Sequence, residues 1–149
     1  MIGAYEGDLI RPLGLVTLYF AYAEGEIDEL LSILNTSAPS TLNWPVGQKL
    51  SRALELVEAL NLPELAALVD TLREAQALAN LRNQLVHGRL FAGGRLKSPN
   101  PKTPDVFISA EEIAQLAERI FTCKEHLFVH RCRHLLPVLS RRGSVAGGT

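Results

Sequence analysis

The sequence predicts a single all-α domain, and three observations favour this fold class. Hydrophobic residues make up 47% of the 149 residues and aromatic residues only 6%; Leu and Ala, which favour helices, supply much of the apolar share. Apolar residues recur at helical spacing in four segments, and the length is that of one domain. We therefore expect an antiparallel four-helix up-and-down bundle over residues 1–142, with a long loop or small hairpin between the third and fourth helices and a flexible tail at 143–149.

The first two predicted helices each carry one apolar stripe. The first runs from about Pro12 to Asn35, and its stripe comprises Val16, Tyr19, Phe20, Ala23, Ile27, Leu30 and Leu34. Two prolines punctuate segment 36–46, which we expect to be a loop. The second helix runs from about Gly47 to Leu60, where the sequence Asn-Leu-Pro breaks the pattern.

The third predicted helix, from about Pro63 to His87 with Gly88 as its cap, is apolar on two sides. Its main stripe is opposed by a second row in the C-terminal half, made of Leu78, Leu81 and Leu85. A helix that is apolar on both sides must be covered on both sides. Since a small four-helix domain lacks the mass to do this alone, we expect a homodimer whose contact lies at Leu78, Leu81 and Leu85.

A long irregular connection, residues 89–108, precedes the fourth helix. Its segment 92–94 is expected to be a turn, and 105–108 a short strand that pairs back. Ser109, with Glu112 three residues later, predicts the start of the fourth helix by a capping box. Pro137 is expected to kink or end that helix.

The charge distribution, the apolar runs and the spacing of the cysteines indicate where in the cell the protein acts. The net charge is only −1, but no acidic residue lies between Glu74 and Asp105, so this part of the chain is basic. No apolar run is long enough to span a membrane, and the N-terminus lacks the basic region of a signal peptide. Cys123 and Cys132 are too far apart in one helix to form a disulfide. We therefore expect a cytoplasmic protein with no membrane association.

The third helix ends in a group of residues that could carry chemistry: Arg82, Asn83 and His87. Asn83 and His87 are four residues apart and therefore neighbours on one helix face. An imidazole titrates near neutral pH and a guanidinium matches the geometry of a phosphate. The alternative interpretation is a buried Asn–His pair that helps to cap the helix.

The segment Leu-Arg-Asn-Gln-Leu-Val-His-Gly, residues 81–88, resembles the motif of the HEPN superfamily, in which Arg-Asn is followed after three residues by His-Gly. Tyr19, Phe20 and Ala23, followed by Glu24, are similar to the opening helix of many such domains. The resemblance implies a HEPN-like bundle and a metal-independent endoribonuclease that needs no cofactor. It also implies a composite active site across a homodimer. Arg82 would hold the scissile phosphate, His87 would act as general acid/base, and Asn83 would orient the groups around them.

The resemblance also implies a toxin–antitoxin, antiviral or stress role, with RNA as substrate. We expect the basic residues after the motif, Arg89, Arg95, Lys97 and Lys102, to contact the RNA backbone. An antitoxin such as a nucleotidyltransferase is a candidate partner, although some HEPN toxins of that kind carry Tyr at the position of Arg89. Two alternatives stay open: a non-catalytic helical module that binds RNA or protein, and a nucleotide-binding regulator.

A weaker pattern lies in the fourth helix, where His126, His130 and His134 are spaced by four residues. Pairs of histidines at this spacing can bind zinc. No further ligand stands in good register with them, so we expect no metal at this position.

Overall fold

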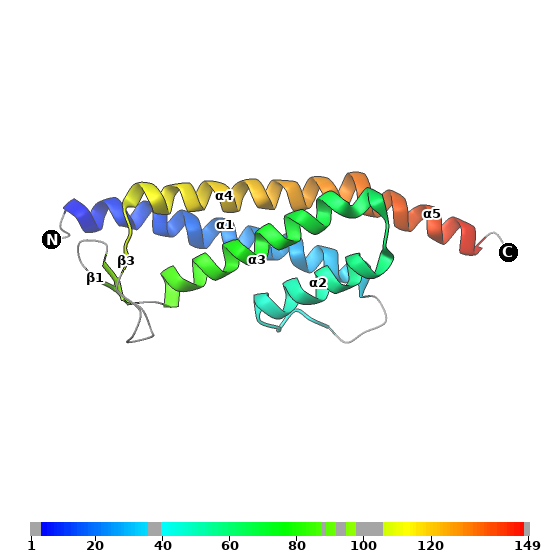
Figure 1. The fold of residues 1–149 in the computed structure, drawn as a ribbon, viewed down its shortest axis with the longest axis horizontal. Helices are drawn as coiled ribbons and strands as arrows, with labels where there is room; N and C mark the ends of the chain where they lie inside the picture. Colours follow the sequence, from blue (N-terminus) through cyan, green and yellow to red (C-terminus); the bar gives the residue numbers. More distant parts are fainter. Residues whose placement is uncertain (1–3, 36–39, 88, 92–94, 98–105, 148–149) are drawn as a thin grey trace.

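The computed structural model describes residues 4–35, 40–87, 89–91, 95–97 and 106–147, with side chains over 9–35, 40–85 and 108–142. Helices form a bundle, and three short strands lie at one end of it (Figure 1). The helices are α1 (Ala4–Leu34), α2 (Val46–Leu60), a 3-10 turn (Pro63–Leu65), α3 (Ala66–His87), α4 (Ala110–His130), a π-helical turn (Arg131–Leu135) and α5 (Leu136–Gly147). The expected all-α class is therefore confirmed.

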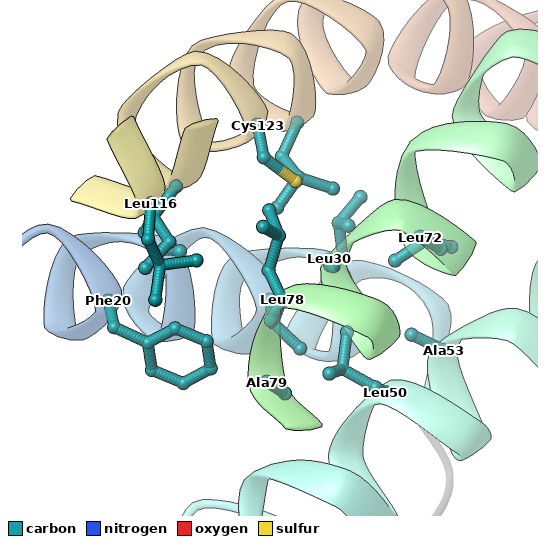
Figure 2. Packing of buried hydrophobic residues seen from close by; sticks show 14 of the residues in the cluster. Phe20, Leu30, Leu50, Ala53, Leu72, Leu78, Ala79, Leu116 and Cys123 are labelled. Atoms are coloured by element: carbon teal, nitrogen blue, oxygen red, sulfur yellow. The ribbon is translucent and has the colours of Figure 1, made fainter. Parts of the chain in front are cut away.

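The core is formed by apolar side chains from all four main helices. Figure 2 shows nine of them with labels, among them Phe20 from α1, Leu50 from α2, Leu78 from α3 and Leu116 from α4. The fully buried large side chains are Ile27, Leu30, Leu31, Leu50, Leu65, Leu68, Leu72, Leu78, Ile113, Ile120, Leu127 and Leu135. These residues recur at the three- and four-residue spacings predicted from the sequence, which is why their side chains fall on the helix sides that face the core.

Helices α1 and α4 lie side by side and run in the same direction (Figure 1). Near their middle the Tyr19 and Phe121 rings are 5.0 Å apart. Further along both helices Arg131 Nη2 lies 3.0 Å from Glu26 Oε2. Because the residue numbers of the contact partners rise together along both helices, the two helices must be parallel.

Helix α2 also runs parallel to α1. Lys49 lies 2.9 Å from Glu24, and Arg52, one turn later, donates to Asn35 at 3.4 Å. The first turn of α2 therefore lies beside the middle of α1 and not beside its end.

Helix α3 runs opposite to its neighbours. Arg119 pairs with Glu74 at 2.9 Å, while the later residue Cys123 donates from Sγ to the earlier Thr71 carbonyl at 3.7 Å. Three main helices thus share one direction and α3 takes the other. This order differs from the alternating up-and-down order expected from the sequence, because α2 runs parallel to α1 where an alternating order would make them antiparallel.

Three antiparallel strands follow α3 in the order β1-β2-β3: β1 (Arg89–Phe91), β2 (Arg95–Lys97) and β3 (Val106–Phe107). The strand expected within 105–108 is confirmed as β3. The turn expected at 92–94 and the cap at Gly88 lie outside the described residues.

The helix boundaries agree with the sequence prediction at Ser109 and differ from it at Pro12 and Pro137. The Ser109 hydroxyl accepts the Glu112 N–H at 3.1 Å, which confirms the predicted start of α4. Helix α1 begins at Ala4, so Pro12 lies inside it and is buried. Pro137 does not end the last helix. The backbone widens into the π-helical turn just before this residue, and Leu136 N–H bonds to Arg131 O. Helix α5 then runs to Gly147, into the expected tail.

Lys49 ties α2 to α1 from a buried position. Its side chain is only 3% exposed, and its ammonium lies 2.9 Å from both Glu24 and Asp28. Burial alone would lower the pKa of Lys49, but hydrogen bonds to the two carboxylates outweigh it and raise the pKa. The ammonium therefore stays charged, and it pairs with both carboxylates on the side of α1 that faces α2.

Replacing Lys49 tests how much this tie contributes. Lys49→Met leaves two carboxylates without their cation, and we expect the free energy of unfolding to fall by about 2 kcal/mol. The loss is below that of a fully buried pair because Glu24 and Asp28 are partly exposed. Urea denaturation measures it. Arg73→Met is the control, since its exposed pair with Glu58 does not involve α1 and contributes about 0.5 kcal/mol; equal losses in the two variants would contradict the account.

Candidate functional site

Arg82 occupies the buried side of α3, near its end. The residues one turn away along the helix, Leu78, Ala79 and Leu85, are all buried, so the helix directs Arg82 toward the core. Its guanidinium carbon lies 4.4 Å from the centre of the Phe20 ring on α1. The side chain is half-buried, and its Nε is buried without a hydrogen-bond partner in the described part of the chain. An unpaired buried donor of this kind costs about 1–3 kcal/mol.

The stacking contact has a chemical consequence. The guanidinium lies over the Phe20 ring, and this cation–π interaction holds the side chain in place. A guanidinium carries five N–H donors, so a contact with an aromatic ring leaves donors for an anion. Arg82 is therefore a fixed cation whose donors can meet a planar or tetrahedral oxyanion.

The other two motif residues lie beside Arg82 in the chain. Asn83 is half-buried, and His87 is the last residue of α3. Four residues of helix place Asn83 and His87 on one side, as predicted. The side chain of His87 lies outside the described residues.

The basic residues expected to contact RNA lie on the strands that follow. Arg89 begins β1, and Arg95 and Lys97 are the first and last residues of β2. The antiparallel register places Arg89 directly opposite Lys97. Lys102 lies outside the described residues. The backbone thus brings three of the four basic residues into one small sheet directly after the motif.

The predicted dimer contact on α3 is wrong for two of its three residues. Leu78 and Leu85 are buried within the single chain, and only Leu81 is exposed, at 38%. The reason is that α3 packs between α2 and α4 and also meets α1, so both of its apolar sides are covered. Figure 2 shows Leu78 among buried side chains from α1, α3 and α4. A helix that is apolar on two sides does need to be covered on both, but here other helices of the same chain cover both sides.

The three histidines of α4 and the π-helical turn form a row of neighbouring, tilted rings. The ring centres of His126 and His130 are 6.0 Å apart, and those of His130 and His134 are 5.3 Å apart. Over the described ranges no group of three or more His, Cys, Asp or Glu is arranged to hold a metal ion. Burial lowers the pKa of His130, and the neighbouring His134 and His126 lower it further.

Neither cysteine forms a disulfide. Cys123 is buried, and burial raises the pKa of its thiol to about 12, so it is protonated at neutral pH and hardly nucleophilic. Cys132 is exposed and free.

Sequence reasoning missed the platform under Arg82. Phe20 was placed correctly on the apolar stripe of the first helix, but helical spacing cannot say which side chain of another helix packs on it. A cation in an otherwise apolar row of α3 was the available signal, because such a residue needs a partner.

Comparisons with family models, curated proteins and solved structures found no match to this chain. Of the helices that the structure describes, none combines the length and apolar character needed to cross a membrane.

The histidine row makes stability depend on pH. The folded state disfavours protonation of His130, whereas the unfolded chain takes up the proton near the ordinary pKa of 6.5. We therefore expect the free energy of unfolding to decrease as the pH falls below about 6.5. His130→Gln removes this slope, which urea denaturation at pH 7.5 and 5.5 measures. His126→Gln, at an exposed position, changes the slope less. An unchanged slope in His130→Gln would count against this assignment.

Proposed function

We propose that this chain is a metal-independent endoribonuclease of the HEPN type, with Arg82, Asn83 and His87 as its catalytic residues. The observation that carries the proposal is the position of Arg82. It is a fixed cation on an aromatic platform, it has a buried donor that lacks a partner in the described residues, and it lies one turn from the end of α3. Arg82 as a whole is only half-buried, and the terminal N–H groups of a guanidinium can bond the oxygens of a phosphate.

The chemistry needs few groups from the protein. The 2′-hydroxyl of RNA is an internal nucleophile, so the protein must supply proton transfer and stabilise the charge that develops on phosphorus oxygens. In the proposal Arg82 binds the scissile phosphate, His87 moves the proton, and Asn83 orients the reacting groups. The basic residues of β1 and β2 follow the motif directly and would contact the RNA backbone.

The biological setting remains part of the proposal. A HEPN-type ribonuclease suits a toxin–antitoxin, antiviral or stress role, with an antitoxin such as a nucleotidyltransferase as a partner. The resemblance also implies a homodimer with a composite active site. Because Leu78 and Leu85 belong to the core, the dimer contact cannot follow the leucine row of α3.

A second candidate function is a non-catalytic helical module that binds RNA or protein. The observation in its favour is the same contact of Arg82 with Phe20. An arginine that lies against an aromatic ring can have packing as its whole role, here between α3 and α1. In that case Arg82 contributes to stability and not to a reaction.

Cleavage of single-stranded RNA in the presence of EDTA tests the proposal. We expect products with 2′,3′-cyclic phosphate or 3′-phosphate ends. Arg82→Ala and His87→Ala should each reduce the rate by about 100-fold or more, the usual contribution of proton transfer or charge stabilisation. Mass spectrometry of the products and gel-based rates provide the measurement.

Arg73→Ala is the matched control, since Arg73 is an exposed arginine on the same helix, paired with Glu58. It should cleave as the wild type does. Full activity of His87→Ala would remove His87 from the mechanism. Absence of cleavage in the wild type, together with a lower melting temperature of Arg82→Ala, would support the non-catalytic module instead.

A further inference from the structure

Helix α1 is apolar on two sides, and the described part of the chain covers only one of them. Its inner stripe, which consists of Val16, Phe20, Ala23, Ile27 and Leu30, is buried against the other helices. On the other side Ile10, Leu18 and Tyr22 are 55%, 44% and 50% exposed. Three large apolar side chains are thus exposed on one side of one helix, as on a helix that contacts a partner.

A regular strip runs along this uncovered side. We call it the outer strip, and it consists of Arg11, Gly14, Leu18, Ala21, Gly25 and Glu29, all exposed. Their spacing of three and four residues keeps them on one side of a helix, as at the contact between two packed helices. At 1.5 Å per residue the strip is about 27 Å long.

The two glycines of the outer strip lie next to open space in the described structure. A Cβ atom built at Gly14 or at Gly25 would meet nothing within 4 Å. Glycine inside a helix is destabilising relative to alanine. Two glycines that nothing in the described chain requires are accounted for if another backbone approaches this side of α1 closely.

The charges at the ends of the strip are complementary to each other. Arg11 lies near one end and Glu29 at the other, and neither forms an ion pair within the described part of the chain. If a second α1 crosses the first in the antiparallel direction between Leu18 and Ala21, Arg11 faces Glu29 of the second copy. Gly14 then faces Gly25 of the second copy, and the same contacts repeat on the other side of the two-fold axis.

We propose that two copies of this chain form a homodimer through the outer strip, with their α1 helices antiparallel. A two-fold contact requires a surface that is complementary to itself, and opposite charges at equal distances from an apolar centre satisfy this condition. A different protein would need no such symmetry in the strip. This proposal does not depend on the ribonuclease activity.

Side chains from α4 extend the same surface. Phe121 is exposed next to Tyr19, and Lys124 Nζ lies 4.6 Å from the centre of the Phe121 ring and 6.0 Å from that of Tyr22. The contact therefore has an aromatic border on the side of α4, with a cation already held against the rings.

The dimer has a consequence for the proposed active site. At about 100° per residue, Leu18 lies about 160° around α1 from Phe20, which carries Arg82. The contact surface and the Arg82 platform are thus on opposite sides of α1, and this dimer gives two separate sites in place of the composite site expected from the resemblance. This consequence rests on the proposed function. Activity of wild-type chains mixed with His87→Ala chains should fall in proportion to the wild-type fraction, whereas a square dependence would indicate a composite site.

The oligomeric state tests the dimer directly. We expect light scattering of the wild type at 50–100 μM to give the mass of two chains. Leu18→Glu should give monomers. Leu136→Glu, at a similarly exposed leucine on α5, is the matched control and should stay dimeric. A monomeric wild type would overturn the proposal, as would a Leu136→Glu variant that dissociates as readily as Leu18→Glu.

Charge reversal tests the antiparallel register with variants at exposed positions. Arg11→Glu places like charges opposite each other twice per dimer, so we expect the dissociation constant to rise about tenfold. Glu29→Arg should have the same effect. The double variant R11E/E29R restores the opposite charges and should return the dissociation constant to the wild-type value. A double variant that is weaker than either single one would overturn the register.

Discussion

Helix α1 has apolar residues around most of its circumference, and the rest of the structure depends on how its sides are covered. Helix α4 lies along one flank, and Arg131 in the π-helical turn that follows it forms a half-buried pair with Glu26 of α1. Helix α2 lies along another and is joined to it by Lys49. Near its end, helix α3 meets the inner stripe between them through the contact of Arg82 with Phe20. Because the described residues leave one side of α1 exposed, the shape of the single chain and its proposed dimer follow from the same constraint.

The candidate site depends on the same helix. Phe20 belongs to the inner stripe of α1, and its ring is the surface on which Arg82 rests. The position of the cation is thus set by the packing of α3 on α1 and not by the motif alone. A site built in this way is rigid where it must hold a phosphate, since the arginine loses little freedom when it binds. One side of α1 then supports the candidate site, and the other side forms the proposed contact with a second chain.

Much of the fold follows from local patterns, and the rest was decided by contacts between distant residues. The stripes of all four helices and the role of Ser109 were predictable, because spacing and capping act within a few residues. The direction of α2 was not, since segment 35–45 contains no signal that says whether the chain turns or returns. The second apolar row of α3 was recognised correctly, but its cover was assigned to a second chain when Leu78 and Leu85 pack inside the first. At the site, the pattern of Arg82, Asn83 and His87 was visible from the sequence, whereas the stacking on Phe20 required the tertiary structure.

The most direct test of the role of α1 is disulfide cross-linking at its two exposed glycines. In a Cys132→Ser background the remaining cysteine, Cys123, is buried and does not interfere. Chains that carry Gly14→Cys are mixed with chains that carry Gly25→Cys, and mild oxidation is followed by mass spectrometry. An antiparallel contact through the outer strip predicts that the mixed pair cross-links efficiently while each variant alone does not. Cross-links between like chains, or none in the mixture, would contradict it.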